Sequence, residues 1–453
     1  MSTIAAISTP NAVGGISVIR ISGENSIEVA ERIFRSTSGK KVAEMNGYTC
    51  AHGVVVDKDT QIDEVILSVF KSPKSYTGED VVEISCHGGV YITKKILRLV
   101  FENGASPAEA GEFTKRAFLN GKLSLTQAEA VIDLISASRQ NELKYAIALK
   151  DGAIFRRIDK IKSEIISVLG DLAAWADFPE DDIPEVDPVN LLKSLKSIYD
   201  ALVKTNKTYD YGRVIREGIN TVISGKPNVG KSTLMNCLSG FERSIVTNVA
   251  GTTRDVVEET VQLGEIKLRL SDTAGIRNTD DFVENIGVNL AFKKIDEADL
   301  VLALFDNSEE FTDEDIQLIE KMSNRKAVAV INKSDEKSVM DRRLVDENFK
   351  HVVEISAKNN KGIDRLVQVV NEMFVREDID AEKGIIANER QKNCIAQAEK
   401  LVWDSINSLE NGELLDAITV ILDEAAGYLL ELTGEKVSET VVDEVFSRFC
   451  IGK

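Results

Sequence analysis

The chain has few of the residues that build extracellular domains or structural zinc sites. Its 453 residues include five cysteines and three histidines. The cysteines are widely separated and odd in number, so they fit neither a disulfide framework nor a zinc-ligand spacing. We therefore expect reduced thiols and a cytoplasmic protein. The cysteines are Cys50, Cys86, Cys237, Cys394 and Cys450.

Long apolar runs and a basic leader are also absent. No apolar stretch approaches the roughly 20 residues of a membrane span. The first apolar residues follow no basic segment, and Pro10, Gly14 and Gly15 interrupt them. We expect neither a secretory signal nor a contact with a membrane.

Positive charge is in short supply. The chain holds 55 lysines and arginines against 74 aspartates and glutamates, a formal net charge of −19. Such a surface repels nucleic acid on average, so any RNA contact must use a local basic patch or the surface of a partner. The length predicts two to four domains.

The pattern of apolar residues predicts an α/β multidomain protein. Residues 1–119 alternate strand-like and helical runs, which is typical of an α/β or α+β domain. Residues 120–213 and 380–453 show helical spacing, whereas strands alternate with helices across 214–379. We expect the two helical parts to pack as one bundle around an inserted domain, rather than as two separate pieces, because neither part alone has much to bury.

A glycine-rich loop lies at the start of the inserted domain. Gly225-Lys226-Pro227-Asn228-Val229-Gly230-Lys231-Ser232 follows the apolar run 219–224 and opens a helical segment at Thr233. In this setting, backbone amides and the helix N-terminus cradle phosphate. Lys231 would reach the terminal phosphates, and the Ser232 hydroxyl would bind magnesium. Taken alone, the pattern could also be a chance match at a strand–turn–helix joint.

Two further motifs fit the phosphate end of a nucleotide. Asp272-Thr273-Ala274-Gly275 follows the apolar alternation of residues 266–270. Asp272 can hold a magnesium-bound water, and the Gly275 amide can sense the terminal phosphate. Between this motif and the loop lies Gly251-Thr252-Thr253-Arg254-Asp255, where a threonine hydroxyl can complete the magnesium shell.

Two more motifs fit the base. Asn332-Lys333-Ser334-Asp335 follows the apolar run 328–331, and the Asp335 carboxylate can accept two hydrogen bonds from guanine, whereas adenine presents the wrong donors. Ser356-Ala357-Lys358 follows residues 352–355, where the Ala357 amide can meet the base carbonyl. The five motifs in this order resemble a translation-factor-class GTPase domain. The resemblance implies a Ras-like P-loop fold with a mostly parallel sheet.

The residue after the Asp-x-x-Gly motif differs from that of many small GTPases. They place a water-orienting glutamine there, whereas this chain has Ile276, which cannot hydrogen-bond through its side chain. Another group must orient water and offset the developing charge. The Asn228 amide and the carbonyls of 247–252 would suit a large monovalent cation, and potassium there would replace an arginine finger. Alternatively, Asn228 merely bonds the backbone of its own loop.

Four segments outside the inserted domain resemble the MnmE (TrmE) family of tRNA modification GTPases. The match extends over essentially the whole chain, and the C-terminal segment is the most specific. The resemblance implies an N-terminal dimerisation domain and a helical domain that the GTPase domain interrupts. The segments are Gly14-Gly15-Ile16-Ser17-Val18-Ile19-Arg20-Ile21-Ser22-Gly23, Tyr76-Thr77-Gly78-Glu79-Asp80, Gly111-Glu112-Phe113-Thr114-Lys115-Arg116-Ala117-Phe118-Leu119-Asn120-Gly121-Lys122 and Phe449-Cys450-Ile451-Gly452-Lys453.

The resemblance also implies a function. A homodimer would act with an FAD-containing partner of the MnmG type, in a heterotetramer or larger complex. Together they would install a 5-carboxymethylaminomethyl or aminomethyl group on the wobble uridine of certain tRNAs. GTP hydrolysis would drive the process, and potassium would promote association of the two GTPase domains. The N-terminal domain would bind 5-formyltetrahydrofolate or another one-carbon tetrahydrofolate.

Individual roles follow from the same resemblance. Glu284 would be the catalytic residue that orients water; without the resemblance, we would interpret it as a solvated helix residue. Magnesium would be bound by Ser232 and Thr253, potassium by Asn228, Thr247, Val249 and Thr252, and folate by Arg20, Glu83, Lys122 and Lys453. The GTP-binding residues would be Asn228, Val229, Gly230, Lys231, Ser232, Thr233, Thr247, Asn248, Val249, Ala250, Gly251, Thr252, Thr253, Asp272, Thr273, Ala274, Gly275, Asn332, Lys333, Asp335, Ser356, Ala357 and Lys358.

The proposed folate residues make chemical sense. The glutamate carboxylates of a folate pair with arginine or lysine, and its pterin edge pairs with a carboxylate such as Glu83. Cys450 would either lie near this pocket or be a buried structural thiol. His87 fits a satisfied turn residue better than a base. The chain departs from the family at Ala110, where a proline is usual, and at residues 11–13, which loosen the early glycine-rich turn.

Two other functions stay open. An assembly GTPase, such as a ribosome-maturation factor, would use its nucleotide state only to gate docking, but such proteins usually carry a basic RNA-binding appendage. The second alternative is a folate-dependent one-carbon transferase with a vestigial GTPase domain. The five intact nucleotide motifs of the sequence argue against this alternative.

Overall fold

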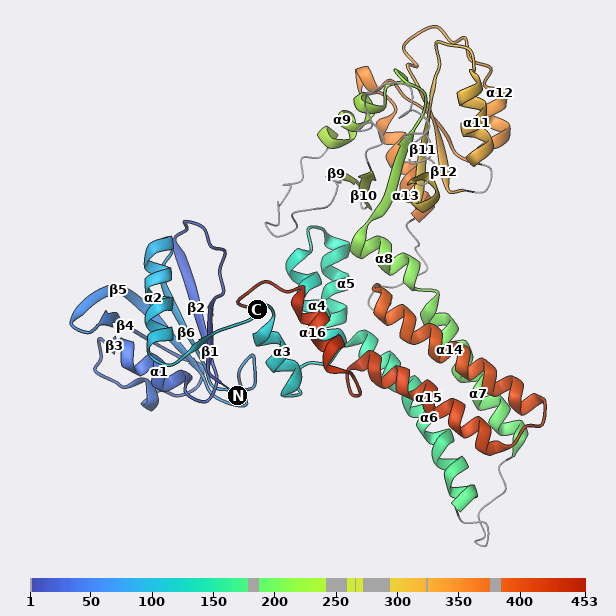
Figure 1. Cartoon of the computed structure of the whole chain (residues 1–453). Coiled ribbons are helices and arrows are strands. Elements are labelled where there is room, and N and C mark those ends of the chain that lie inside the picture. Colours follow the sequence, from blue (N-terminus) through green and yellow to red (C-terminus); the bar gives the residue numbers. More distant parts are fainter. Residues whose placement is uncertain are drawn as a thin grey trace, which may run out of the picture.

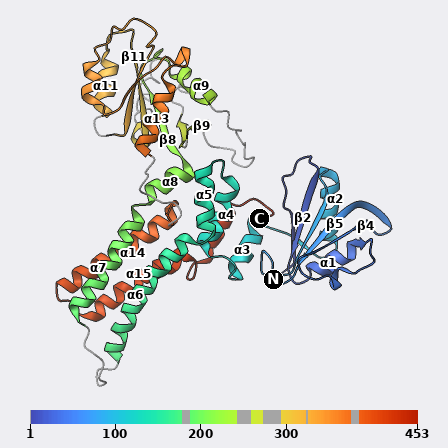
Figure 2. The same ribbon diagram turned by 180° about the vertical axis from the view of Figure 1, so that it is seen from behind.

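A computed structural model describes residues 2–177, 187–241, 259–264, 266–271, 294–322, 325–374 and 384–453. The chain forms an N-terminal sheet domain, a long helical bundle and a second sheet domain, with the bundle between the two others (Figure 1). Seen from behind, the C-terminal segment runs from the bundle back to the N-terminal domain (Figure 2). Within the described residues, no helix is long and apolar enough to cross a membrane.

The N-terminal domain is a seven-stranded sheet with two helices on one face. The strand order is β3-β4-β5-β6-β2-β1-β7, and only β1 and β7 pair in parallel. Ile19 and Ile84 face the helices in the core, so the alternation of strand residues turns Arg20 and Glu83 to the open face. The elements are β1 (Ile4–Ile7), β2 (Ile16–Ser22), α1 (Ser26–Ile33), β3 (Phe34–Ser36), β4 (Thr49–Asp57), β5 (Thr60–Phe70), β6 (Val81–His87), α2 (Val90–Glu102) and β7 (Ser106–Pro107).

The helices before and after the second sheet domain form one bundle, as the sequence predicts. A single buried cluster joins Ile158 of α6, Leu195 of α7, Val402 of α14 and Leu422 of α15. The bundle helices are α4 (Leu125–Ser136), α5 (Gln140–Lys150), α6 (Ala153–Asp177), α7 (Pro188–Asn206), α14 (Glu389–Glu410), α15 (Leu415–Thr433) and α16 (Glu439–Ser447). The short helix α3 (Glu112–Leu119) lies between the bundle and the N-terminal sheet. A further helix, α8 (Tyr209–Glu217), leads from the bundle to the second sheet domain (Figure 1).

Local signals set where the bundle helices begin. The Ser124 hydroxyl and the Gln127 side chain form a reciprocal capping box at the start of α4. Asp187 caps α7, and Pro188 fits its first turn because the missing N–H would have no partner there. Asn388 accepts a hydrogen bond from the Gln391 amide at the start of α14.

The second sheet domain, here called the inserted domain, has a six-stranded sheet of order β13-β12-β11-β8-β10-β9. All neighbours pair in parallel except β9 and β10. β11 is buried along its whole length because helices cover both faces, which explains its unbroken apolar run. The elements are β8 (Ile219–Ser224), α9 (Lys231–Phe241), β9 (Glu259–Leu263), β10 (Ile266–Ser271), β11 (Leu300–Asp306), α11 (Asp313–Met322), β12 (Ala327–Asn332), α12 (Arg343–Asn348), β13 (Val352–Glu354) and α13 (Ile363–Phe374).

The predicted fold class is confirmed, with a mostly parallel sheet in the inserted domain. The boundary expected between residues 213 and 214 falls inside α8, so the connection is a continuous helix and not a flexible linker.

Candidate functional site

The glycine-rich loop joins β8, at the centre of the parallel sheet, to the first turn of α9. Gly230 has φ +104°, and a side chain at this position would collide with the Asn332 amide. Asn228 is exposed and takes a left-handed conformation with φ +63°, which asparagine tolerates better than most residues. The loop therefore turns tightly and directs the N-terminus of α9 toward its interior, the geometry that suits an anion.

Lys231 lies inside this loop. Its ammonium donates hydrogen bonds to the carbonyl oxygens of Gly225 at 2.6 Å and Lys226 at 2.9 Å. Burial lowers the pKa of Lys231 below its ordinary value. A terminal phosphate in the loop would meet this amine and the first amides of α9 together.

The base-reading segments lie at the same edge of the sheet. The carboxyl ends of β8, β11 and β12 meet there because the three strands are parallel and adjacent. The buried Asn332 side chain donates to the Val229 carbonyl at 2.8 Å and accepts from the Ala357 amide at 3.0 Å. One side chain thus ties the phosphate loop to both segments that would read the base.

Polar contacts fix the remaining base-reading residues. Lys333 has φ +61° and forms an ion pair with the buried Asp306. The Ser356 hydroxyl, hydrogen-bonded to Asp335, holds the pKa of that carboxyl below its usual range, and the charge of Lys358 acts in the same direction. The carboxylate is therefore ionised and acts only as an acceptor, as recognition of a guanine edge requires.

The structure also reveals contacts that the sequence motifs do not predict. The ammonium of Lys226, inside the glycine-rich loop, pairs with Glu309 at 2.8 Å and lies 3.5 Å from Asp315 at the start of α11. The Cys237 thiol of α9 donates to the Ala357 carbonyl at 2.8 Å. No local pattern signals these contacts, because each joins residues about 80 or more positions apart.

A second group of predicted residues lies outside the described part of the chain. It includes Glu284, the predicted magnesium ligand Thr253 and three of the four predicted potassium ligands. The full group is Thr247, Asn248, Val249, Ala250, Gly251, Thr252, Thr253, Asp272, Thr273, Ala274, Gly275 and Glu284.

The open face of the N-terminal sheet carries another charged site. Arg20 and Glu83 lie directly opposite each other on β2 and β6, with Nε 2.8 Å from Oε1. The Arg20 guanidinium also lies over the rings of Tyr76 and Phe113, 5.3 and 5.6 Å from their centroids. This site places a fixed cation and a carboxylate beside aromatic surface.

The C-terminal segment reaches the same site. The Lys453 carbonyl accepts from the Phe113 amide at 3.2 Å, and the Gly452 carbonyl accepts from the Ser8 hydroxyl at 3.0 Å. Burial lowers the pKa of the Lys453 amine, and the positive charge of Arg20 lowers it further. The charges of Arg20, Glu83 and Lys453 therefore interact at this site.

The other residues predicted for this region have different surroundings. Lys122 donates to the Pro73 carbonyl at 2.9 Å, beside the loop that carries Tyr76. Cys450 is exposed, so the interpretation as a buried structural thiol is wrong. Its neighbours in the C-terminal segment take the hydrogen bonds that hold that segment in place. His87 is a satisfied residue, as expected, because Asp63 accepts from both its ring and its backbone amide.

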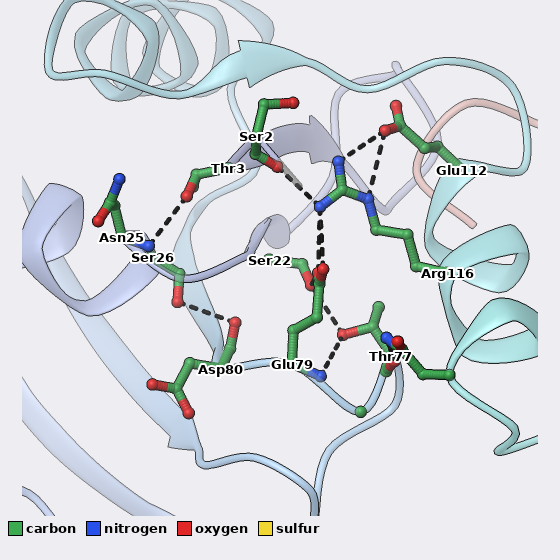
Figure 3. A network of polar contacts seen from close by, with 12 residues as sticks. Ser2, Thr3, Ser22, Asn25, Ser26, Thr77, Glu79, Asp80, Glu112 and Arg116 are labelled. Atoms are coloured by element: carbon green, nitrogen blue, oxygen red, sulfur yellow. Dashed lines mark hydrogen bonds and ion pairs between the residues drawn. The ribbon is translucent and has the colours of Figure 1, made fainter.

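A buried arginine holds this region together (Figure 3). Arg116 of α3 is only 3% exposed. Its guanidinium donates to the Ser2 carbonyl at 2.7 Å, Glu112 at 2.8 Å and Glu79 at 3.1 Å (Figure 3). Glu79 in turn accepts from the Ser22 hydroxyl at 2.8 Å. The network ties α3 to the sheet and so positions Phe113, whose amide donates to the Lys453 carbonyl. No local sequence pattern predicts this role of Arg116.

Comparisons with known proteins cover the whole chain. The family model of the MnmE helical domain matches residues 125–450, and that of the GTP-binding protein TrmE N-terminus matches residues 3–122. The chain is 42% identical to the tRNA modification GTPase MnmE of Acetivibrio thermocellus, over 100% of this chain and 99% of the relative. The tRNA modification GTPase MnmE of Clostridioides difficile is 40% identical, again over 100% of this chain and 99% of the relative.

Solved structures resemble a smaller part. A variant of Era from Aquifex aeolicus bound to GDP.AlF4- is 28% identical over 40% of this chain and 66% of that chain, with a TM-score of 0.28. The G domain of the FeoB iron transporter of T. maritima is 24% identical over 34% of this chain and 97% of that chain, with a TM-score of 0.26.

The position of Asp335 generates a test of base recognition. In Asp335→Asn, one carboxylate oxygen becomes an amide donor that faces a donor of guanine, so we expect the affinity for GTP to fall at least about 100-fold. Xanthosine triphosphate should bind better than to the wild type, because xanthine presents a carbonyl at that position. Calorimetric titration measures both affinities.

The matched control is Asp341→Asn, which alters a carboxylate whose pKa is also lowered by a neighbouring hydrogen bond but which pairs with Arg343. It should bind both nucleotides as the wild type does. Unchanged GTP affinity in Asp335→Asn would show that this carboxylate does not read the base.

Proposed function

Because the chain belongs to the MnmE family of tRNA modification GTPases, we propose that it is a potassium-activated GTPase acting on tRNA. With a flavin-dependent partner of the MnmG type, it would install a 5-carboxymethylaminomethyl or aminomethyl group on the wobble uridine of certain tRNAs. We assign residues 1–119 to folate binding and dimerisation, 120–213 with 380–453 to the helical domain, and 214–379 to the GTPase domain. Five unpaired cysteines support a cytoplasmic location.

The observation that carries the proposal is the double hydrogen bond of Asn332. It joins the phosphate loop at Val229 to the base-reading segment at Ala357. A nucleotide bound along this edge would have its phosphates and its base fixed by one connected set of contacts. The preorganised contacts among the described residues of the site argue against a vestigial domain.

Several residues of this chain would divide the work of hydrolysis. Lys231 and the amides of Ser232 and Thr233 would bind the phosphates, and Ser232 with Thr253 would hold magnesium. Asn228, Thr247, Val249 and Thr252 would hold potassium, which supplies positive charge to the developing phosphoryl oxygens. Asn228 is exposed in the left-handed turn of the loop, so its side-chain oxygen is accessible to a cation. Glu284 would orient the attacking water.

The N-terminal domain would bind the one-carbon folate. The positive charge of Arg20 lowers the pKa of the partly buried Lys453 amine, and an anion bound beside both would relieve this repulsion. The folate would supply the carbon unit, Glu83 would pair with its pterin edge, and Arg20, Lys122 and Lys453 would pair with its carboxylates.

Exposed apolar residues near the starts of β2 and α2, at one end of the N-terminal sheet, support dimerisation. Val13 is 86% exposed and Tyr91 81% exposed, and Ile16 lies directly opposite His87 in the sheet. A second copy of the chain would cover these side chains.

The first test of the proposed function compares wobble-uridine nucleosides from cells with and without the protein. We expect the 5-substituted uridine to disappear from the affected tRNAs when the gene is removed and to return with the wild-type chain. Mass spectrometry of nucleosides measures both. Unchanged modification would favour an assembly GTPase, for which ribosomal subunit profiles are the companion measurement.

The second test addresses the cation. Replacement of potassium by sodium should slow GTP hydrolysis about tenfold or more, because the smaller ion fits the oxygen ligands poorly and a charge next to the phosphoryl group is misplaced. Phosphate release at matched ionic strength measures this. Equal rates in the two salts would remove potassium from the mechanism.

A variant separates the cation from the proposed water-orienting residue. Glu284→Ala should keep nucleotide affinity while hydrolysis in potassium falls about 100-fold. Normal turnover in this variant would return Glu284 to the role of a solvated helix residue.

The third test addresses the folate site. Arg20→Met should weaken binding of 5-formyltetrahydrofolate about tenfold or more, because a charge-assisted hydrogen bond is lost. The matched control is Arg98→Met on α2, where Arg98 pairs with Glu102 on the helix surface. Equilibrium dialysis measures both, and equal affinities would place folate elsewhere.

A further inference from the structure

The chain crosses between the bundle and the inserted domain twice, and the described residues of the two crossings are packed together. α8 makes the first crossing, and residues 384–388 return to the bundle. The Ile386 amide donates to the Thr208 hydroxyl at 3.2 Å. Any side chain at Gly212 would collide with the Ile386 carbonyl, so α8 and the return segment lie in direct contact. We call α8 with residues 384–388 the neck (Figures 1 and 2).

Two arginines of α8 lie nearly one helical turn apart and pair with different domains. Arg213 forms a bidentate pair with Asp299 of the inserted domain, with distances of 2.9 and 2.6 Å. Asp299, which directly precedes β11, also accepts a hydrogen bond from the Asn220 amide of β8 at 3.0 Å. The Arg213–Asp299 pair therefore connects α8 to the first residues of both strands. Arg216 pairs with Asp133 of α4 in the bundle at 2.8 Å.

The Arg216–Asp133 pair is largely shielded from solvent. The Asp133 side chain is 10% exposed and the Arg216 side chain 21% exposed. A polar cavity of about 490 Å³ lies against Arg216 and is also lined by Arg390, Glu444 and Arg448. α16 therefore forms part of the wall of this cavity, and its chain continues into the C-terminal segment that reaches Arg20.

Charge pairs of this kind determine the relative orientation of two domains more than they strengthen the association between them. Desolvation offsets much of their attraction, so an apolar contact would bind the domains as well. A bidentate pair, however, favours one geometry over neighbouring ones. The bidentate Arg213–Asp299 pair and the single Arg216–Asp133 hydrogen bond lie on one helix and reach two domains, so together they restrict the rotation of α8 relative to both.

We propose that Arg213 and Arg216 are positioning residues that make α8 a rigid coupling between the inserted domain and the bundle. A rotation of the inserted domain then moves α4 and the wall of the polar cavity, and through α16 the C-terminal segment. This inference rests on the proposed function, in which GTP hydrolysis drives chemistry at the N-terminal domain. The inference adds a structural route between the nucleotide site of the inserted domain and the charged site of the N-terminal domain.

The variant Asp133→Asn/Arg216→Gln tests the bundle side of the neck without leaving an unpaired buried charge. The readout is the number of uridines modified per GTP hydrolysed, measured with the flavoprotein partner and tRNA. We expect hydrolysis to stay within about twofold of the wild type and this ratio to fall about tenfold. Arg216→Lys, which keeps the charge, should retain more of the ratio than Arg216→Met.

The matched control is Lys162→Met/Glu435→Gln. It removes a charge pair between the buried Lys162 of α6, which also pairs with Asp159, and the more exposed Glu435 after α15, entirely within the bundle. Its ratio should equal that of the wild type. An unchanged ratio in the neck variant, or an equal loss in the control, would overturn the proposal.

A distance measurement tests the coupling by α8 independently of tRNA modification. If the wild type modified no tRNA, that result would reject only the proposed function, and the distance measurement would still decide whether the two pairs fix α8. Spin labels at Leu414→Cys in the bundle and Val339→Cys in the inserted domain report the angle between the two. Both sites are exposed, and the exposed Cys50 and Cys450 are replaced by serine. We expect a narrow distance distribution that broadens in the neck variant but not in the control. Equal widths would show that the pairs do not fix the neck.

Discussion

The nucleotide site depends on one constraint: the parallel sheet brings distant segments to a single edge, and one buried amide joins them. Asn332 can contact Val229 and Ala357 only because β8, β11 and β12 are adjacent and parallel. The close approach also requires the absence of a side chain at Gly230. A mostly apolar sheet interior leaves such an amide few alternative partners, so its two hydrogen bonds specify one arrangement of the loops.

The strands that lead to the glycine-rich loop and to the two base motifs are predicted well because the information is local. These three motifs follow apolar runs directly, and the strands β8, β10, β12 and β13 begin and end close to the predicted limits. The N-terminal domain is less predictable. The strand β4 begins Thr49-Cys50-Ala51-His52-Gly53, which lacks the apolar alternation of a half-buried strand, and its place in the sheet depends on pairing with β5.

Long-range charge pairs are the part that local patterns do not predict. Arg116 meets Glu79 across 37 positions, and Arg216 meets Asp133 across 83. Arginines on amphipathic helices are usually solvated, and nothing in their immediate sequence distinguishes these two. The exposure of Cys450 has the same origin, because backbone contacts of Ile451, Gly452 and Lys453 with the N-terminal domain decide which way the segment faces.

The three domains are thus connected by polar contacts of defined geometry. Arg116 fixes α3 to the N-terminal sheet, and the C-terminal segment adds a second connection beside it. The neck makes two connections at the other end of the bundle. Each junction combines a covalent crossing with a second contact, which is the docked C-terminal segment at one end of the bundle and the contact of residues 384–388 with the start of α8 at the other. Under the proposed coupling, a displacement at the nucleotide site would reach the open face of the N-terminal sheet through the bundle, without requiring any domain to unfold.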